Sequence, residues 1–139
     1  MKKSVGNKIL LSIIIPYHQK KKFFHSTIKS IYSQTFKNYE VILIYDDNDY
    51  GEINFVKNQL KKIKNRKLIV NKKILGPGLS RNIGIKYAKG KLIAFCDADD
   101  TWHKNKLSEQ IKFMAKNNLK FSHTSYNIIN YNGKKTGQF

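Results

Sequence analysis

The sequence predicts an α/β fold in which a mostly parallel sheet is flanked by helices. Short runs of β-branched and aliphatic residues alternate along the chain with segments of helical periodicity. The strand-like runs are almost continuously apolar, as parallel strands are when helices cover both of their faces. The 139 residues, of which 40% are hydrophobic, fit one domain over residues 1–139.

The first strand and the first helix come from residues 9–35. Residues 9–15 form an apolar run, and Pro16 is expected to end that strand because proline has no backbone N–H for a ladder. Residues 23–35 then follow with helical periodicity. One face of this helix is apolar: Phe24, Ile28, Ile31 and Tyr32.

Residues 40–71 repeat this order. Residues 40–45 predict a second buried strand, and residues 67–71 predict a third. The acidic turn at residues 46–49 supplies capping side chains for the helix between them. The apolar face of that helix consists of Ile53, Val56, Leu60 and Ile63.

Glycines mark the next helix. Residues 76–78, Gly-Pro-Gly, break the chain before a helix over residues 79–88, and Gly90 is expected to end it. Residues 92–96 predict a fourth strand.

The C-terminal part adds a helix and a strand. Residues 104–116 predict the helix, and residues 121–131 predict a fifth strand before a hairpin turn at Asn132-Gly133.

The charge and the cysteine content limit the classes of function. The 27 Lys+Arg and 9 Asp+Glu give a net charge of +18, which favours anionic partners: nucleic acid, anionic lipid or phosphorylated small molecules. Cys96 is the sole cysteine, so no intramolecular disulfide forms, and its apolar neighbours predict a core residue in a protein of the reducing cytosol. The N-terminal apolar run is too short to span a bilayer and predicts no signal peptide.

Three polar clusters follow three predicted strands, at Pro16-Tyr17-His18, Asp46-Asp47 and residues 97–100. Ligands of open parallel sheets bind at the carboxyl ends of the strands, so we expect these clusters to meet at one edge. A carboxylate there can accept from a uracil imide or a ribose hydroxyl, or else cap a helix. Tyr17 can stack on a nucleobase or pack at the rim of the sheet. His18 can serve as a metal ligand or a proton acceptor, but a lone histidine in a loop is more often neither.

The Asp97-Ala98-Asp99 segment predicts a metal site. In an extended segment, alternate side chains point the same way, so both carboxylates can converge on one cation. Mg²⁺ and Mn²⁺ accept one or two carboxylates together with substrate phosphates. The alternative interpretation is an acidic turn that caps the next helix through Asp100 or Thr101.

A phosphate contact is expected at the glycine-rich helix start over residues 76–84. Arg81 is placed in the first helical turn, where backbone N–H groups and the helix dipole also favour an anion. The segment matches neither the P-loop pattern nor the dinucleotide fingerprint.

In order, these segments resemble the family 2 glycosyltransferases, an inverting family with the GT-A (Rossmann-like) fold. The similarity covers about residues 12–110. Its motifs are Ser12-Ile13-Ile14-Ile15-Pro16-Tyr17, residues 28–36 with their Ser-x-x-x-Gln ending at Ser30 and Gln34, residues 40–47 with the acidic end Asp46-Asp47, residues 78–85 with Arg81-Asn82-Ile83-Gly84, and residues 91–102 with Asp97-Ala98-Asp99. His18 and Gln19 depart from the asparagine or small residue usual in that family.

The resemblance implies a role for each motif in binding a nucleotide-sugar, with UDP as the expected nucleotide. Donor-binding positions are Pro16, Tyr17, Asp46, Asp47, Arg81, Asp97 and Ala98. Asp99, with Asp97, would hold a divalent metal, Mn²⁺ or Mg²⁺. The acceptor would be a glycan or a lipid-linked glycan of surface polysaccharide assembly.

The resemblance also implies that the acceptor half and the catalytic base lie beyond Phe139. The chain is therefore expected to be truncated and incomplete at its C-terminal side, either an enzyme or a donor-binding fragment without transfer activity. We expect it in the cytoplasm, either free or in peripheral contact with the inner face of the membrane. A basic nucleic-acid-binding module is a weaker alternative without a recognised motif, and a nucleotidyltransferase would carry a glycine-rich basic loop after its first strand.

Overall fold

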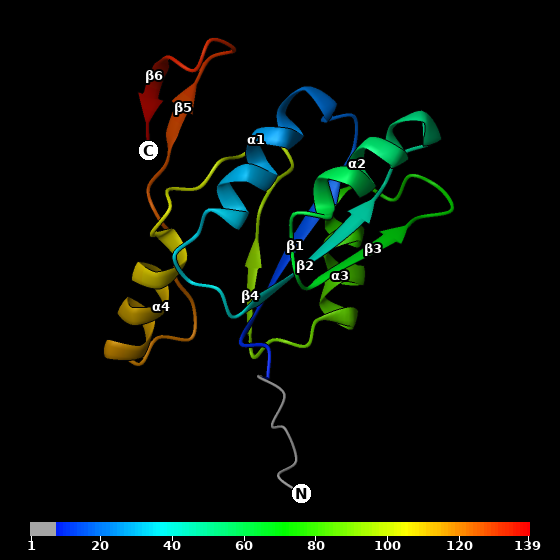
Figure 1. The fold of residues 1–139 in the computed structure, drawn as a ribbon. Helices are drawn as coiled ribbons and strands as arrows, with labels where there is room; N and C mark the ends of the chain where they lie inside the picture. Colours follow the sequence, from blue (N-terminus) through cyan, green and yellow to red (C-terminus); the bar gives the residue numbers. More distant parts are fainter. Residues whose placement is uncertain (1–7) are drawn as a thin grey trace, which may run out of the picture.

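Four parallel strands form the central sheet of the computed structural model, which describes residues 8–139. The elements in chain order are β1 (Leu11–Tyr17), α1 (Lys21–Tyr32), β2 (Tyr39–Tyr45), the short 3₁₀ helix η1 (Tyr50–Glu52), α2 (Ile53–Leu60), β3 (Arg66–Val70), α3 (Pro77–Tyr87), β4 (Leu92–Phe95), α4 (Lys106–Lys116), β5 (Asn127–Ile129) and β6 (Lys135–Gln138). The strand order is β3-β2-β1-β4 (Figure 1). The predicted parallel α/β architecture is confirmed.

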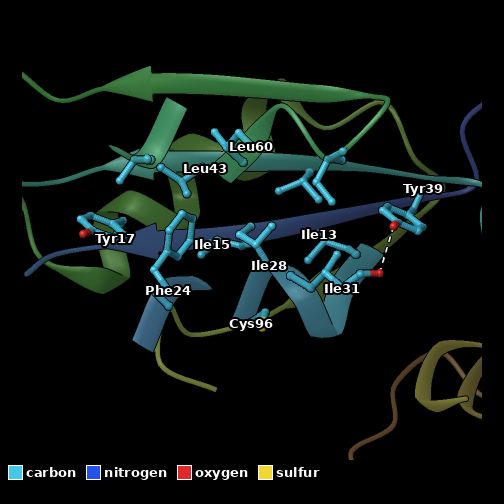
Figure 2. Packing of buried hydrophobic residues seen from close by; sticks show 14 of the residues in the cluster. Ile13, Ile15, Tyr17, Phe24, Ile28, Ile31, Tyr39, Leu43, Leu60 and Cys96 are labelled. Atoms are coloured by element: carbon cyan, nitrogen blue, oxygen red, sulfur yellow. Dashed lines mark hydrogen bonds between the residues drawn. The ribbon is translucent and has the colours of Figure 1, made fainter. Parts of the chain in front are cut away.

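Helices cover both faces of this sheet, with α1 and α2 on one face and α3 on the other (Figure 1). Successive residues of β1 therefore point into different layers, because side chains alternate along a strand. Ile13 and Ile15 pack with Phe24 and Ile28 of α1 (Figure 2), whereas Ile14 packs in the layer beneath α3. All five side chains are fully buried, which explains the unbroken apolar run of the strand.

β1 continues through Pro16 to Tyr17, so the prediction that Pro16 ends the strand is wrong. Cys96 N donates to Ile14 O at 3.1 Å, which shows that the backbone N–H and C=O groups of the even-numbered residues of β1 point toward β4. Because β4 ends at Phe95, the nitrogen of Pro16 points beyond the end of that ladder. A missing N–H costs nothing at such a position.

The predicted helices are present, with ends shifted by a few residues. The acidic turn does cap a helical start, but that start belongs to η1 and not to α2: Asp49 accepts from Gly51 N at 2.8 Å, and the N-cap of α2 has no side-chain hydrogen bond. α3 begins at Pro77, which fits the preference of proline for the first helical position. Among residues 8–139, no helix is both long enough and apolar enough for a bilayer crossing.

Two glycines allow close packing around α3. A Cβ on Gly84 would lie 2.4 Å from Ile14 Cγ2, so the helix approaches the sheet as only glycine permits. Gly90 does not end the helix as predicted, because the helix already stops at Tyr87. Its hydrogen instead faces the backbone of β1, where a Cβ would lie 2.6 Å from Ser12 N.

The predicted fifth strand over residues 121–131 is wrong in length and in place. Only Asn127–Ile129 form β5, which pairs antiparallel with β6 outside the parallel sheet. Ile128 and Ile129 are exposed, so this segment gains no buried apolar contact that would favour its joining the parallel sheet. The hairpin turn around Gly133, at φ +75°, is confirmed.

Candidate functional site

A pocket lies at the carboxyl ends of β1, β2 and β4, beside the start of α3. It is lined by Pro16, Tyr17, His18, Lys20, Asp46, Ile74, Gly76, Pro77, Arg81, Asp97, Ala98 and Asp99. All of the expected site residues except Asp47 therefore meet at one edge of the sheet. A second, more open hollow along α3, lined by residues between Leu75 and Lys86, has no acidic lining residue.

Two ion pairs join the two carboxylates of the Asp97-Ala98-Asp99 segment to basic side chains of the pocket. Arg81 Nη2 lies 2.6 Å from Asp97 Oδ1, and Lys20 Nζ lies 2.7 Å from Asp99 Oδ2. The hydrogen bond to Asp99 raises the pKa of Lys20, with burial acting in the opposite direction. Asp97 and Asp99 thus each have a cationic partner of their own.

The segment carrying these carboxylates is a tight turn, so the expectation of an extended segment is wrong. β4 ends at Phe95, and Asp100 N donates to Asp97 O at 3.1 Å across the turn. Thr27 of α1 fixes the turn, because its hydroxyl donates a hydrogen bond to Ala98 O at 2.9 Å. The side chain of Ala98 is buried, which leaves Asp97 and Asp99 directed to the accessible side.

The chemistry of this pair of carboxylates fits a divalent cation whose remaining ligands come from phosphates and water. Both side chains are partly accessible, at 51% for Asp97 and 36% for Asp99. Mg²⁺ is commonly held by one or two carboxylates with substrate phosphates completing the shell. Within residues 8–139, no three His, Cys, Asp or Glu side chains gather into a closed metal site.

Gln34 fixes the loop that follows the acidic turn. Its side chain is fully buried, donates to His103 O at 2.8 Å and accepts from Leu107 N at 3.1 Å. The end of α1 is thereby attached to the start of α4. These hydrogen bonds give a physical reason for the glutamine that ends the Ser-x-x-x-Gln motif of the first helix.

Asp46 holds the loop before α3 in place. Its carboxylate accepts from Leu75 N at 2.8 Å, from Gly76 N at 2.7 Å and from Asn71 Nδ2 at 2.7 Å. Burial raises the pKa of Asp46, but these hydrogen bonds and one from Ser80 outweigh it, so the net shift is downward. Both oxygens of Asp46 are thus already hydrogen-bonded. The side chain holds the pocket wall in place and has little capacity left to bind a ligand.

Asp47 does not line the pocket, which corrects its expected place in a base-binding wall. The side chain is buried, and its oxygens accept from Gln19 N at 2.9 Å and Asp49 N at 3.0 Å. It therefore connects the end of β2 to the turn between β1 and α1. Gln19 in that turn has a φ of +49°, in the left-handed region that glycine and asparagine adopt more readily than glutamine.

Tyr17 lines the pocket, but its ring is fully buried in the layer of α1 and α2. The ring stacks on Tyr45 at 5.3 Å between centroids, and its hydroxyl donates to Glu52 at 2.6 Å. In this structure the ring therefore packs in the core beside Tyr45, which agrees with the packing interpretation and not with the stacking one. Burial raises the pKa of Tyr45 to about 12.

His18 and Arg81 complete the walls. His18 Nδ1 lies 2.8 Å from Asp46 O, which orients the ring at the pocket edge. Arg81 is the fifth residue of α3, one position beyond the first turn expected for it, and it reaches back to the pocket.

Lys20 is a pocket residue that the sequence did not single out. It stands in a run of three lysines, Lys20 to Lys22, and nothing in the pattern distinguishes the one that faces the acidic turn. Its position three residues after the end of β1 was the available signal, because the carboxyl end of that strand is where the pocket opens.

Cys96 is excluded as a nucleophile. Its side chain is buried in the core cluster (Figure 2), and burial raises the pKa of its thiol well above the usual range. The prediction of a core residue is confirmed.

Comparison with known proteins identifies relatives for almost the whole chain. An uncharacterized glycosyltransferase of Rickettsia conorii is 45% identical over 136 residues, which cover 96% of this chain and 22% of that protein. The Escherichia coli protein WfgD, named a UDP-Glc:alpha-D-GlcNAc-diphosphoundecaprenol beta-1,3-glucosyltransferase, is 38% identical over 88% of this chain and 48% of its own length. The chain thus spans about a fifth to a half of these relatives.

A solved structure shares the fold. S. aureus TarS 1-349 in complex with UDP-GlcNAc superposes with a TM-score of 0.69 at 25% identity, over 77% of this chain and 31% of that one. The predicted GT-A arrangement is confirmed by this likeness, for the part of the fold that the chain covers. The model of the family described as "Glycosyl transferase family 2" matches residues 12–138, and with these relatives it shows that the protein belongs to that family.

Proposed function

We propose that residues 1–139 form the nucleotide-sugar-binding domain of a metal-dependent glycosyltransferase. The observation that carries this proposal is the meeting of Arg81, Asp97 and Asp99 in one pocket at the start of α3. Cationic groups, a helix N-terminus and two accessible carboxylates are what a diphosphate and its cation require.

The pocket residues divide the donor between them in this proposal. Arg81 faces the diphosphate, Asp97 lies near the ribose and the sugar, and Asp99 holds Mn²⁺ or Mg²⁺ together with Asp97. Pro16 and Ala98 contribute backbone to the nucleoside end, next to the backbone of Tyr17. Asp46 and Asp47 act through the loops that they hold, as their hydrogen bonds indicate.

The chemistry expected of a bound divalent cation is neutralisation of the charge that develops on the leaving diphosphate. The guanidinium of Arg81 adds a donor to the same group. A catalytic base that deprotonates the acceptor hydroxyl is still required. We place that base and the acceptor-binding residues in the additional length that the relatives have, so transfer by this chain alone is not part of the proposal.

The substrate class follows from the relatives' names. TarS is described in complex with UDP-GlcNAc, and WfgD is named for UDP-Glc and a diphosphoundecaprenol-linked acceptor. We propose a UDP-sugar donor and a glycan or lipid-linked acceptor in surface polysaccharide assembly, handled in the cytoplasm at the inner face of the membrane.

Calorimetric titration of UDP, with and without Mn²⁺, tests the donor site. We expect Mn²⁺ to tighten UDP binding at least about tenfold, within the usual range of coupling between two ligands. Asp99→Asn should abolish that gain. Asp49→Asn is the matched control, because Asp49 caps η1 and does not line the pocket. Metal-independent UDP affinity that survives unchanged in Asp99→Asn would contradict the proposal.

A further inference from the structure

We propose that Lys20 exchanges partners at the donor site, pairing with Asp99 when the site is empty and with the donor diphosphate when a divalent cation takes Asp99. The inference rests on the proposed function, and it makes Lys20 a donor-binding residue. Lys20 Nζ lies 2.7 Å from Asp99 Oδ2, and both residues line the same pocket.

The charges of the empty pocket already balance. Two carboxylates, of Asp97 and Asp99, each face one cation, of Arg81 and Lys20. A divalent cation alone would place two further positive charges beside Lys20 and Arg81. A diphosphate alone would place its charge beside two carboxylates. Only when both ligands enter together are all the charges compensated, since each freed cation then gains an anionic partner.

The geometry allows this exchange without movement of the backbone. Lys20 precedes the first residue of α1, and the turn before it is held by the hydrogen bond from Gln19 N to Asp47. The lysine side chain is 41% exposed and ends in a flexible four-carbon stem, so it can reorient toward the pocket interior. Asp99 sits on a turn held by Thr27, so the carboxylate stays in place while its partner changes.

The neighbouring lysines are directed elsewhere. Lys21 Nζ lies 5.8 Å from the ring centre of Phe55, and Lys22 Nζ lies 4.3 Å from that of Tyr131. Neither lines the pocket. The sequence thus supplies an internal control, because Lys21→Gln removes the same charge one residue away from the site.

Two isotherms on the wild-type chain, Lys20→Gln, Lys20→Arg and Lys21→Gln test the exchange. The first isotherm measures Mn²⁺ binding without nucleotide, and the second measures UDP binding at saturating Mn²⁺. Lys20→Gln should bind Mn²⁺ alone about two- to fivefold more tightly, because the competing ammonium is gone. It should bind UDP with Mn²⁺ about tenfold more weakly, because a charged hydrogen bond to phosphate is lost. Lys20→Arg and Lys21→Gln should stay close to the wild type in both.

The opposite signs of the two changes are the signature of partner exchange. Unchanged or weakened Mn²⁺ binding in Lys20→Gln would show that Lys20 does not compete for Asp99, and would overturn the inference. Unchanged or tighter UDP binding at saturating Mn²⁺ would overturn it as well, because Lys20 would then never reach the diphosphate. If the wild-type chain itself fails to bind UDP with Mn²⁺, the proposed function fails and this inference fails with it.

Discussion

Replacing Asp46 by asparagine should destabilise the chain strongly, although the two side chains have almost the same shape. The carboxylate accepts from the backbone N–H groups of Leu75 and Gly76 at 2.8 and 2.7 Å, one on each oxygen. An asparagine oxygen can keep one of these bonds, while its NH₂ group faces the other N–H and cannot accept from it. Losing one hydrogen bond to a charged acceptor and leaving a buried donor unpaired costs about 2–4 kcal/mol.

The dependence on pH identifies the cause. The pKa of Asp46 is lower in the folded chain than the usual unfolded value of about 3.9. A carboxyl group of this kind stabilises the fold fully above its unfolded pKa, and the stabilisation is lost as the pH falls through the folded pKa. The difference in unfolding free energy between the wild type and Asp46→Asn should therefore be largest at neutral pH and should shrink as the solution is acidified below pH 4.

Urea denaturation of both proteins at pH 7 and at pH 3 measures that difference. Asp49→Asn is the control, since asparagine caps a helical start about as well as aspartate and should change the stability by less than about 0.5 kcal/mol. A loss below about 1 kcal/mol for Asp46→Asn at pH 7, or an equal loss at both pH values, would refute the role assigned to the carboxylate from its hydrogen bonds.

The remaining predictions concern three backbone positions. Gly84→Ala should lower the unfolding free energy by about 1–3 kcal/mol, because its Cβ would overlap Ile14. Gly78→Ala, also in α3 but with nothing within 4 Å, should raise the unfolding free energy by about 0.5–1 kcal/mol in the same denaturation assay, and a loss at both glycines would contradict the packing argument. Gln19→Asn should raise the thermal midpoint through a gain of about 0.5 kcal/mol, since asparagine tolerates the positive φ better; an unchanged or lower midpoint would count against backbone strain at this turn.

The sheet could be predicted from the sequence because its signals are local and agree with one another. Each apolar run is bounded by turn residues and followed by helical periodicity, so β1 to β4 fall close to their predicted positions. The rule that ligands gather at the carboxyl strand ends then brought three distant clusters together correctly. The hairpin strands at Asn127–Ile129 and Lys135–Gln138 lack such support, because their side chains are mostly exposed and so leave no apolar run in the sequence.

The roles within the site were harder to predict than its location. Asp46 and Asp47 are adjacent acids at the end of one strand, and their sequence context is the same. Alternation along the chain gives them different surroundings: one side chain binds the amides before α3, and the other binds the turn at Gln19. The burial of the Tyr17 ring follows from the same alternation, which places it in one layer with Ile13 and Ile15.

The open side of β4 affects how separate molecules of this chain behave toward one another. Ile93 and Phe95 are 39% and 49% exposed, and β4 pairs with β1 alone among residues 8–139. An unpaired strand border with apolar side chains is a template for association with a strand of another copy. The net charge of +18 opposes such contact, because two copies of the chain repel each other. Salt weakens this repulsion: at an ionic strength of 0.1 M, charges more than about 10 Å apart are largely screened. We therefore expect the charge to keep molecules of this chain apart in dilute buffer, and the exposed border of β4 to promote their association in concentrated salt.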